Sequence, residues 1–383
     1  MPGTYYDVVI AGGGPAGCAC AITLRQAGYS VCLIDPLREA AFKVGEALPG
    51  AAIRLLHRLG FAGLAELMPA GTYKTCVANL SAWGSDSWQA MDAMLNPEGG
   101  GWHLNRVCFD SALMHRVQTL GVTIEQGRIS TCQYVPASGQ AASVHHVGYI
   151  KNPSGQAQQV QAKWVVDASG RSAVIAKKYG VQRFRLDTQM AAVVWLQSQV
   201  ADKDDTTRIK SAENGWWYSA RLPGGKRVLA FFTEPQHAAE YAKQPCRLVT
   251  AANQSGVLPF LVSESDIVYG VRVANAGVSK LKQAAGEGWL AVGDAASSLD
   301  PLSSQGIFFA LFSGIRGAES IVANDQNADD VGHLRDYQQK LDRVFQATQQ
   351  ARFYHYSNEL RFIARPYWQQ RLRSTQSVAD MAS

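Results

Sequence analysis

Short apolar runs that end in glycine or in an acidic residue pattern the first part of the chain. Residues 5–11 form an apolar strand pattern, and the glycine-rich residues 12–17 follow directly. A helix-like run covers 18–28, and a second apolar run over 30–34 leads to Asp35. Strand, helix and strand in this order predict a parallel βαβ unit.

Similar apolar runs return far downstream. Residues 164–167 end at Asp167 and are followed by Gly170, while 288–294 end at Asp294. Each has the pattern of a buried strand. Three other segments alternate like antiparallel strands, and a hairpin turn at 223–226 joins the last two: 191–196, 215–220 and 227–232. Long helices are predicted over 306–323 and over 333–374, the latter rich in aromatic residues.

The first unit fits the ADP part of a dinucleotide. Gly12 permits a tight turn, Gly14 lets the backbone approach the pyrophosphate, and Gly17 lets helix and strand pack closely. The free N–H groups and the helix dipole then face the phosphates, and Asp35 is placed to accept from the ribose. The nucleotide-binding residues predicted here are Gly12, Gly14, Pro15, Ala16, Gly17 and Asp35.

The downstream motifs indicate FAD rather than NAD. Asp294 is expected to hold ribityl or ribose hydroxyls, and the helix that begins at Gly306 is expected to direct its positive end at the flavin. The further cofactor-binding residues predicted from these motifs are Asp167, Gly170, Gly293, Asp294, Gly306 and Ile307. We find no second Gly-x-Gly-x-x-Gly motif, so no resident NAD(P) domain is predicted.

Composition excludes several other classes. The net charge of +5 over 383 residues comes without a dense basic run, so nucleic-acid binding is not expected. The seven cysteines form no Cys-x-x-Cys pair, which argues against a disulfide reductase. No metal site is predicted. The apolar stretches look too short to span a membrane and no signal peptide is visible, so we expect a cytoplasmic protein without a membrane span.

In this order, the three nucleotide motifs resemble those of the FAD-dependent monooxygenase and halogenase superfamily, which includes p-hydroxybenzoate hydroxylase. The resemblance implies an α/β fold with a Rossmann-like FAD-binding domain, an antiparallel-sheet substrate domain and a helical C-terminal tail. The expected FAD-binding domain is discontinuous, over 1–70, 100–180 and 270–345. The substrate domain is expected over 71–99 and 181–269, and the tail over 346–383.

Two loops resemble the active-site face of that superfamily. Residues 42–49 match the Gly-Glu…Pro loop that passes the flavin in halogenases, which implies close backbone approach at Gly45 and a hydrogen-bonding or helix-capping role for Glu46. Lys43 is a candidate contact to flavin or substrate, and the alternative is a lysine exposed to solvent. Arg106 matches a position that reaches the FAD, and the alternative is a salt bridge to Asp110. His103 is a candidate for the substrate cavity, and the alternative is a structural histidine. The catalytic candidates are therefore Lys43, Glu46 and His103.

Trp216 and Trp217 are the substrate-binding candidates. Because they are adjacent on a predicted strand they face opposite sides, so one is expected in the core and the other at the cavity. Tryptophan halogenases carry the motif Gly-Trp-x-Trp-x-Ile-Pro here, and this chain has only the first two residues of that motif. The nearest match to the halogenases' catalytic lysine is Lys74, which is poorly placed. These departures argue against halogenation.

Four further segments resemble the LodB/GoxB-type flavoproteins of cysteine tryptophylquinone biogenesis: 45–50, 81–85, 101–110 and 215–225. The resemblance implies a monooxygenase that hydroxylates a Trp side chain of a quinoprotein precursor. It would use O2, with electrons from NAD(P)H or from a separate reductase. The alternatives are a halogenase or a small-molecule aromatic hydroxylase, a geranylgeranyl-reductase-like enzyme, and a flavin-bearing maturation chaperone.

Overall fold

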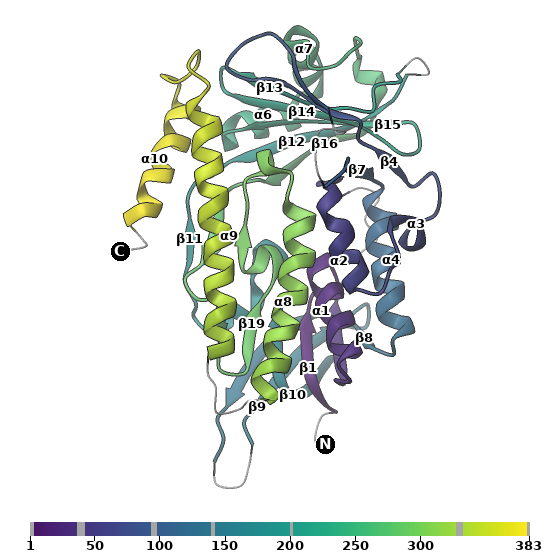
Figure 1. The fold of residues 1–383 in the computed structure, drawn as a ribbon, viewed down its shortest axis with the longest axis vertical. Helices are drawn as coiled ribbons and strands as arrows, with labels where there is room; N and C mark the ends of the chain where they lie inside the picture. Colours follow the sequence, from purple (N-terminus) through teal and green to yellow (C-terminus); the bar gives the residue numbers. More distant parts are fainter. Residues whose placement is uncertain are drawn as a thin grey trace.

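The structure is a computed structural model, and it describes residues 4–36, 43–92, 98–138, 142–199, 202–326 and 332–380. Two large sheets lie one above the other, with long helices along the side of the lower sheet (Figure 1). The C-terminal helices α9 (Gly332–Ser357) and α10 (Pro366–Asp380) run beside both sheets. The arrangement is the α/β fold with an antiparallel sheet and a helical tail that the sequence predicts.

The lower sheet contains the βαβ unit. β1 (Tyr5–Ala11) pairs in parallel with β2 (Val31–Asp35) and with β10 (Ala157–Asp167), and α1 (Pro15–Gln26) connects β1 to β2. β8 (Thr123–Val135) and β19 (Trp289–Ala291) extend the parallel part on its two sides. The remaining strands pair antiparallel: β9 (Val144–Lys151) and β18 (Ala285–Gly286). The carboxyl ends of β1, β10 and β19 therefore meet at one edge, which is where a doubly wound sheet binds its ligand.

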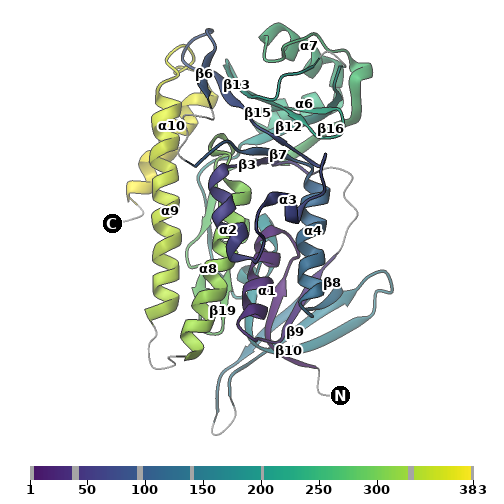
Figure 2. The same cartoon turned by 45° about the vertical axis from the view of Figure 1, so that its right-hand side comes forward.

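Three helices cover one face of this sheet: α1, α4 (Arg106–Thr119) and α8 (Gly306–Gln326) (Figure 2). A Cβ on Gly314 would lie 2.4 Å from the carbonyl oxygen of Ala16, so α1 and α8 approach closely only because position 314 is glycine. Among the described helices, only α8 is long and apolar enough to cross a membrane, with a mean hydropathy of 1.4. The sequence predicts apolar stretches too short for a span, and α8 is longer than that prediction. Half of its apolar window is buried inside the protein, as in a core helix.

The upper sheet is antiparallel apart from one pair. β12 (Met190–Gln197), β14 (Gly215–Leu222) and β15 (Lys226–Thr233) form its centre, as the alternating segments predict. The outer strands are β16 (Ile267–Asn275), β13 (Thr207–Ala212), β5 (Ala78–Ala82) and β6 (Gln89–Asp92), and only β13 with β5 is parallel. One face packs on α6 (Pro235–Lys243) and α7 (Pro245–Ser255). The other face looks toward the lower sheet and the C-terminal helices.

Short elements join the two layers. They are two small sheets, β3 (Ala47–Leu48) with β7 (Trp102–Leu104) and β4 (Tyr73–Thr75), and β11 (Arg183–Arg185) with β17 (Ser279–Leu281) and β20 (Ser297–Ser298). The short helices are α2 (Ile53–Arg58), α3 (Leu64–Leu67) and α5 (Val174–Lys178). The elements fall in the order that the sequence-based domain boundaries suggest, and those boundaries stay a prediction.

The helical tail is largely packed onto the upper sheet. Tyr356, Tyr367 and Trp368 are buried, and the Trp368 indole donates to the Ala212 carbonyl at 3.1 Å. Tyr354, by contrast, is 62% exposed. The tail is therefore mainly part of the core, with an exposed apolar tip.

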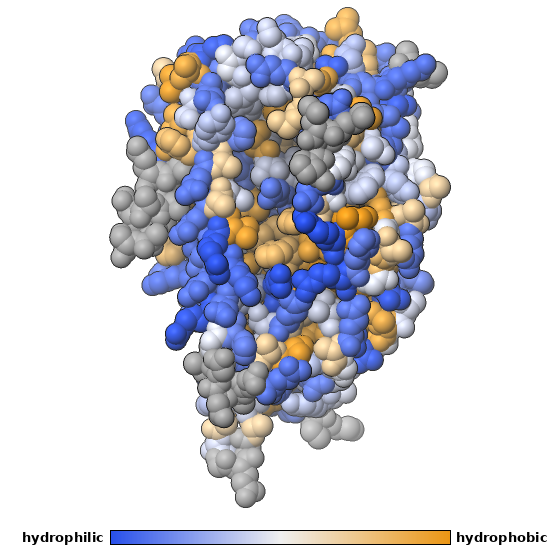
Figure 3. Space-filling view, viewed as in Figure 1, coloured by the Kyte–Doolittle hydropathy of each residue, from blue (hydrophilic) through white to orange (hydrophobic). Residues whose placement is uncertain are grey.

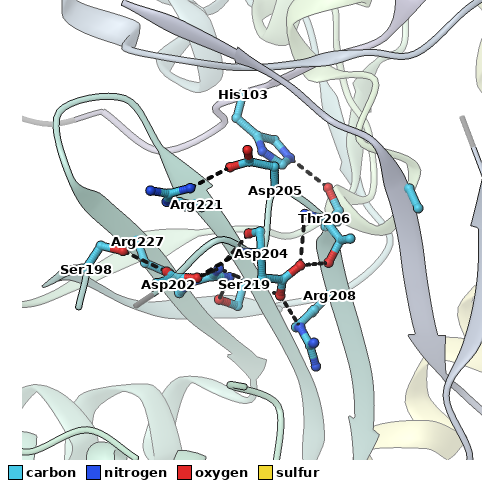
Figure 4. Close-up of polar contacts among 12 residues, drawn as sticks. His103, Ser198, Asp202, Asp204, Asp205, Thr206, Arg208, Ser219, Arg221 and Arg227 are labelled. Carbon is cyan, nitrogen blue, oxygen red and sulfur yellow. Dashed lines mark hydrogen bonds and ion pairs between the residues drawn. The ribbon is translucent and has the colours of Figure 1, made fainter. Parts of the chain in front are cut away.

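A buried ion pair stabilises the upper sheet below its β14–β15 hairpin (Figure 4). The side chains of Arg227 and Asp202 are both fully buried and meet in two hydrogen bonds of 2.9 Å. The Arg227 guanidinium also donates to the Asp204 carbonyl at 2.7 Å and to the Ser219 hydroxyl at 3.3 Å. Because each of the three guanidinium nitrogens donates to a partner, the charge is tolerated inside the protein.

Replacing Arg227 with Met is expected to lower the free energy of unfolding by about 3–5 kcal/mol, because it leaves the Asp202 carboxylate buried and unpaired. The matched control is Arg247→Met, whose pair with Glu240 has both side chains about half exposed. Urea unfolding of the two variants measures the difference. Equal, small losses for both would show that the buried pair does not stabilise the fold.

Candidate active site

A cavity of about 350 Å³ lies between the two sheets. Its lower side is built from the turn after β1, the loop before β3, the end of β10 and the start of α8. Its upper side is the face of β12, β14, β15 and β16. Of the predicted site residues, ten line it: Gly14, Pro15, Ala16, Gly45, Glu46, Arg106, Gly170, Asp294, Gly306 and Ile307.

The glycines of the turn after β1 have different structural roles. Gly14 has ordinary extended dihedrals, φ −74° and ψ −178°, and a Cβ built there has no atom within 4 Å, so it opens into the cavity. Gly12 and Gly17 do not line the cavity. Gly12 has φ 112°, and a Cβ on Gly17 would lie 1.9 Å from the Gly12 carbonyl oxygen. These two glycines bring β1 and α1 together, while Gly14 leaves space for a ligand.

Two of the predicted nucleotide-binding acids are not exposed to the cavity. Asp167 is fully buried, and its oxygens accept from the amides of Ser169, Ile175 and Ala176 and from the Ser169 hydroxyl. The amides of the loop after β10 therefore bind the Asp167 carboxylate, which holds this loop in place. The carboxylate is not left free for the predicted contact with the cofactor. Asp35 accepts from the Gly13 amide at 2.6 Å and also lies outside the cavity lining.

The start of α8 and the residues after β19 form the other end of the cavity. Asp294 lies on the lining with its side chain 40% exposed, 3.4 Å from Arg171. Gly293 lies behind it with φ 59°, and its amide donates to the Ser313 hydroxyl. Gly306 and Ile307 begin α8 at the lining, so the first amides of a 21-residue helix face the cavity.

The loop before β3 brings Gly45 and Glu46 to the cavity. Gly45 has φ 85°, and Arg106 holds its carbonyl at 2.7 Å and that of Val44 at 2.9 Å. Arg106 also pairs with Asp110 one turn further along α4. Of the two alternatives considered for Arg106, the salt bridge to Asp110 is present. Arg106 also lines the cavity, and its contact with FAD stays a prediction.

Lys43 and His103 lie outside this cavity. Lys43 is paired with Asp110 at 2.7 Å and does not line the cavity. His103 is fully buried on β7, where its Nε2 lies 2.8 Å from the Thr207 hydroxyl. Burial and the nearby Arg227 charge lower the pKa of His103 to about 4, so its ring is neutral at pH 7. Neither residue touches the cavity, and we treat both as structural.

Glu46 is the unusual polar group of the site. It is 4% exposed, and within the described chain its Oε1 has no hydrogen-bond partner. Burial raises the pKa of Glu46 to about 7, and the Arg106 charge, the loop amides and the Trp195 indole oppose that rise. Tyr218 lines the same cavity, and burial and the Glu46 charge raise the pKa of its hydroxyl. The carboxyl group is therefore placed to exchange a proton near neutral pH.

The upper wall is apolar and was not predicted from the sequence. Apart from Tyr218 and Asn275, its members are small or hydrophobic: Ala191, Val193, Val228, Ala230, Phe232, Ala274 and Ala276. Alternation along β12, β14 and β15 was visible, but it does not tell which face of the sheet meets the cavity. The position of Tyr218, two residues after Trp216, was the signal available.

Neither Trp216 nor Trp217 lines the cavity, which corrects the prediction that one of them would. They do face opposite sides of β14. Trp217 packs under α6 and α7 against Phe231. Trp216 lies on the cavity side of the sheet but stacks on Phe232, with the two ring centroids 4.0 Å apart. Its indole donates to the Tyr356 hydroxyl at 3.1 Å. The C-terminal helices cover it.

A buried acid at the cavity rim links the site to those helices. Asp300 lines the cavity, and its Oδ2 accepts from Arg352 at 2.9 Å and from Tyr356 at 3.3 Å. Arg352 is buried as well and also pairs with Asp187. Helix α9 thus fixes the loop that leads into α8.

Comparison with known proteins places the chain. The family model described as tryptophan halogenase matches residues 72–382, and an FAD-binding-domain model matches 7–43. The chain belongs to the tryptophan halogenase family. It is 27% identical over 380 residues to the FAD-dependent oxidoreductase LodB of Marinomonas mediterranea, covering 96% of both chains. It is 28% identical over 329 residues to a 1H-pyrrole-2-carbonyl-[peptidyl-carrier protein] brominase of Pseudoalteromonas luteoviolacea, covering 82% of this chain and 77% of the relative.

Solved structures share the fold. The flavin-dependent brominase Bmp2 superposes with a TM-score of 0.77 at 22% identity, covering 97% of this chain and 93% of that one. The peptidyl tryptophan dihydroxylase QhpG superposes with a TM-score of 0.75 at 24% identity, covering 96% of this chain and 79% of that one. Membership of this family makes the protein an FAD-dependent oxidoreductase.

The residues that line the cavity fit the pyrophosphate and flavin parts of FAD. The space over Gly14, where a Cβ meets nothing, lies on the same lining as the amides at the start of α8. Arg106, Arg171 and Asp294 add charged and hydrogen-bonding groups at intervals along the lining. Gly14, Pro15 and Ala16 would hold the pyrophosphate, and Gly45, Gly306 and Ile307 would flank the flavin.

Proposed function

We propose that this flavoprotein hydroxylates an aromatic ring, and that the ring is a Trp side chain carried by the polypeptide precursor of a quinoprotein. The observation that carries the proposal is the chemistry of the cavity: an apolar wall facing one buried carboxyl group with an unpartnered oxygen. An indole matches this arrangement, with a flat apolar body and one N–H donor. The similarity to a peptidyl tryptophan dihydroxylase supports a protein-borne ring.

The residues of the chain bind and orient the ring. The small side chains of Ala191, Val193 and Ala230 leave a flat surface against which an indole packs and excludes water. FAD held by the glycine turn and the start of α8 would, when reduced, supply the electrons that activate O2 for transfer to the ring. NAD(P)H or a separate reductase would deliver those electrons.

Glu46 would move the proton. In its ionised form, Oε1 accepts a hydrogen bond from the indole N–H, which fixes the orientation of the ring and raises its electron density. When oxygen is transferred, a proton must leave the ring, and a carboxylate whose pKa is about 7 is able to take it. Tyr218, beside Glu46 and neutral at pH 7, is a hydrogen-bond donor at the wall.

Halogenation is the second candidate, because the family model and the brominase relative favour it. The residues around the cavity argue against it. The described lining contains no lysine, and Lys74, the nearest match to a halogenase lysine, lies on β4 paired with Asp205 at 3.2 Å.

One experiment separates the two reactions. Reduced enzyme is supplied with isotopically labelled O2 and the unmodified precursor, with and without bromide. Hydroxylation adds labelled oxygen in both cases, whereas a halogenase adds bromine and depends on the halide.

A further inference from the structure

Strand β16 is an open edge of the upper sheet. It pairs with β12 on one side, and no strand in the described ranges pairs with it on the other. Val268 and Val273 are 36% and 40% exposed, and Arg272 is exposed as well. An edge strand of this kind presents a row of backbone donors and acceptors that a further strand can pair with.

The half of β16 next to the cavity is the regular half. The pairing with β12 is shifted between Val193 and Trp195 and again at Leu196, which disturbs the start of β16. From Arg272 to Asn275 the pairing has no shift. A bulged edge resists pairing, whereas a regular one accepts it. The open, regular part of the edge therefore covers four residues.

This regular part ends in the cavity wall. Ala274 is paired with Ala191, and both line the cavity. Asn275 and Ala276 continue the lining. Residues opposite each other in an antiparallel pair share a face and lie about 5 Å apart. A side chain on an added strand, opposite Ala274, would thus project on the cavity side of the sheet.

Arg272 adds a positive charge on the cavity face of this edge. It is paired with Val193, which lines the cavity, so Arg272 lies on the cavity face of the sheet. It is exposed, and the alanine at 274 on the same face leaves room for an incoming backbone. A carboxylate on the bound chain would meet this guanidinium at the rim.

We infer that β16 binds the substrate polypeptide as an added β-strand, which delivers one aromatic side chain over Ala274 into the cavity. The inference rests on the proposed function, because only a protein-borne ring needs backbone recognition beside the site. Main-chain pairing along Arg272–Asn275 supplies affinity with little dependence on sequence, and the cavity selects the ring.

The test is hydrogen exchange on the FAD-loaded enzyme. The probe is a synthetic peptide of roughly ten residues with one central Trp among alternating Thr and Val. The expected result is at least tenfold slower exchange in the segment that contains Arg272–Asn275. The control peptide has the same sequence with N-methyl groups on alternate amides, in both registers, and is expected to give no protection.

Two proline variants test the edge itself. The N–H groups of successive strand residues point alternately to β12 and outward, so only one of Arg272→Pro and Val273→Pro breaks the existing ladder. The variant that keeps the wild-type melting temperature has lost an outward donor. That variant is expected to bind the peptide at least tenfold more weakly. Unchanged affinity would overturn the inference.

The outcomes separate this inference from the proposed function. Hydroxylation of the peptide without protection of β16 overturns the inference and leaves the function standing. Protection of β16 without hydroxylation supports the binding surface and overturns the function. Protection of β16 that increases with enzyme concentration in the absence of peptide overturns the inference, because a second copy of the chain then binds the edge.

Discussion

Replacing Gly14 with Glu is expected to give a folded protein that retains no FAD. The backbone at Gly14 has φ −74° and ψ −178°, which any residue adopts, and a Cβ there has no protein atom within 4 Å. The fold therefore has no reason to resist the change. The new carboxylate would occupy the space over the turn and repel the pyrophosphate. Flavin absorbance after FAD titration measures the loss, and thermal unfolding of the FAD-free proteins measures the fold.

The matched control lies three residues further on. A Cβ on Gly17 would be 1.9 Å from the Gly12 carbonyl oxygen, so Gly17→Ala is expected to disturb the contact between β1 and α1 itself. We expect Gly14→Glu to keep the melting temperature of the wild-type FAD-free protein and Gly17→Ala to lower it. A Gly14→Glu protein that still turns yellow with FAD would contradict the assignment of the cofactor to this cavity.

Replacing Glu46 with Gln is expected to lower kcat for ring hydroxylation by about 100-fold, the smaller part of what a general base contributes. The amide keeps the size of the side chain but cannot take a proton. Because the pKa of Glu46 is about 7, the wild-type kcat should rise with pH through 7, and the variant should lack this rise. The control is Glu240→Gln on the outer helix α6, where the carboxylate is exposed. An unaltered pH profile in Glu46→Gln would remove the residue from the mechanism.

The same substitution has an effect on stability with a defined sign. Folding raises the pKa of Glu46 from 4.5 to about 7, so the folded protein binds the proton more tightly than the unfolded chain does. The stability that belongs to the protonated form is complete below pH 4.5 and is lost as the pH rises through 7. The loss is on the order of 3 kcal/mol. At pH 8 the FAD-free Glu46→Gln protein should therefore be the more stable of the two in urea.

Local sequence predicts the parts of the site that depend on local geometry. The glycine turn, Gly45, and the start of α8 at Gly306 each lie where their motif places them on the cavity. In each case the backbone within a few residues determines the position. The same holds for the hairpin between β14 and β15, which the turn residues at 223–226 specify.

The rest depends on contacts between distant parts of the chain. Trp216 is excluded from the cavity by Tyr356, which lies 140 residues further on. Tyr218 and the small residues of the upper wall reach the cavity because the upper sheet packs over the lower one. That packing depends on contacts along the whole chain. Periodicity cannot supply this information, since it identifies faces but not their neighbours.

The central claim is that the ring belongs to a protein. Its most direct test is to incubate the reduced enzyme with labelled O2 and the unmodified quinoprotein precursor, and to map the product by peptide mass spectrometry. The account predicts labelled oxygen on a single Trp, with or without bromide, and none when Gly14→Glu replaces the wild type. Turnover of free tryptophan or another small aromatic with the precursor untouched would contradict it.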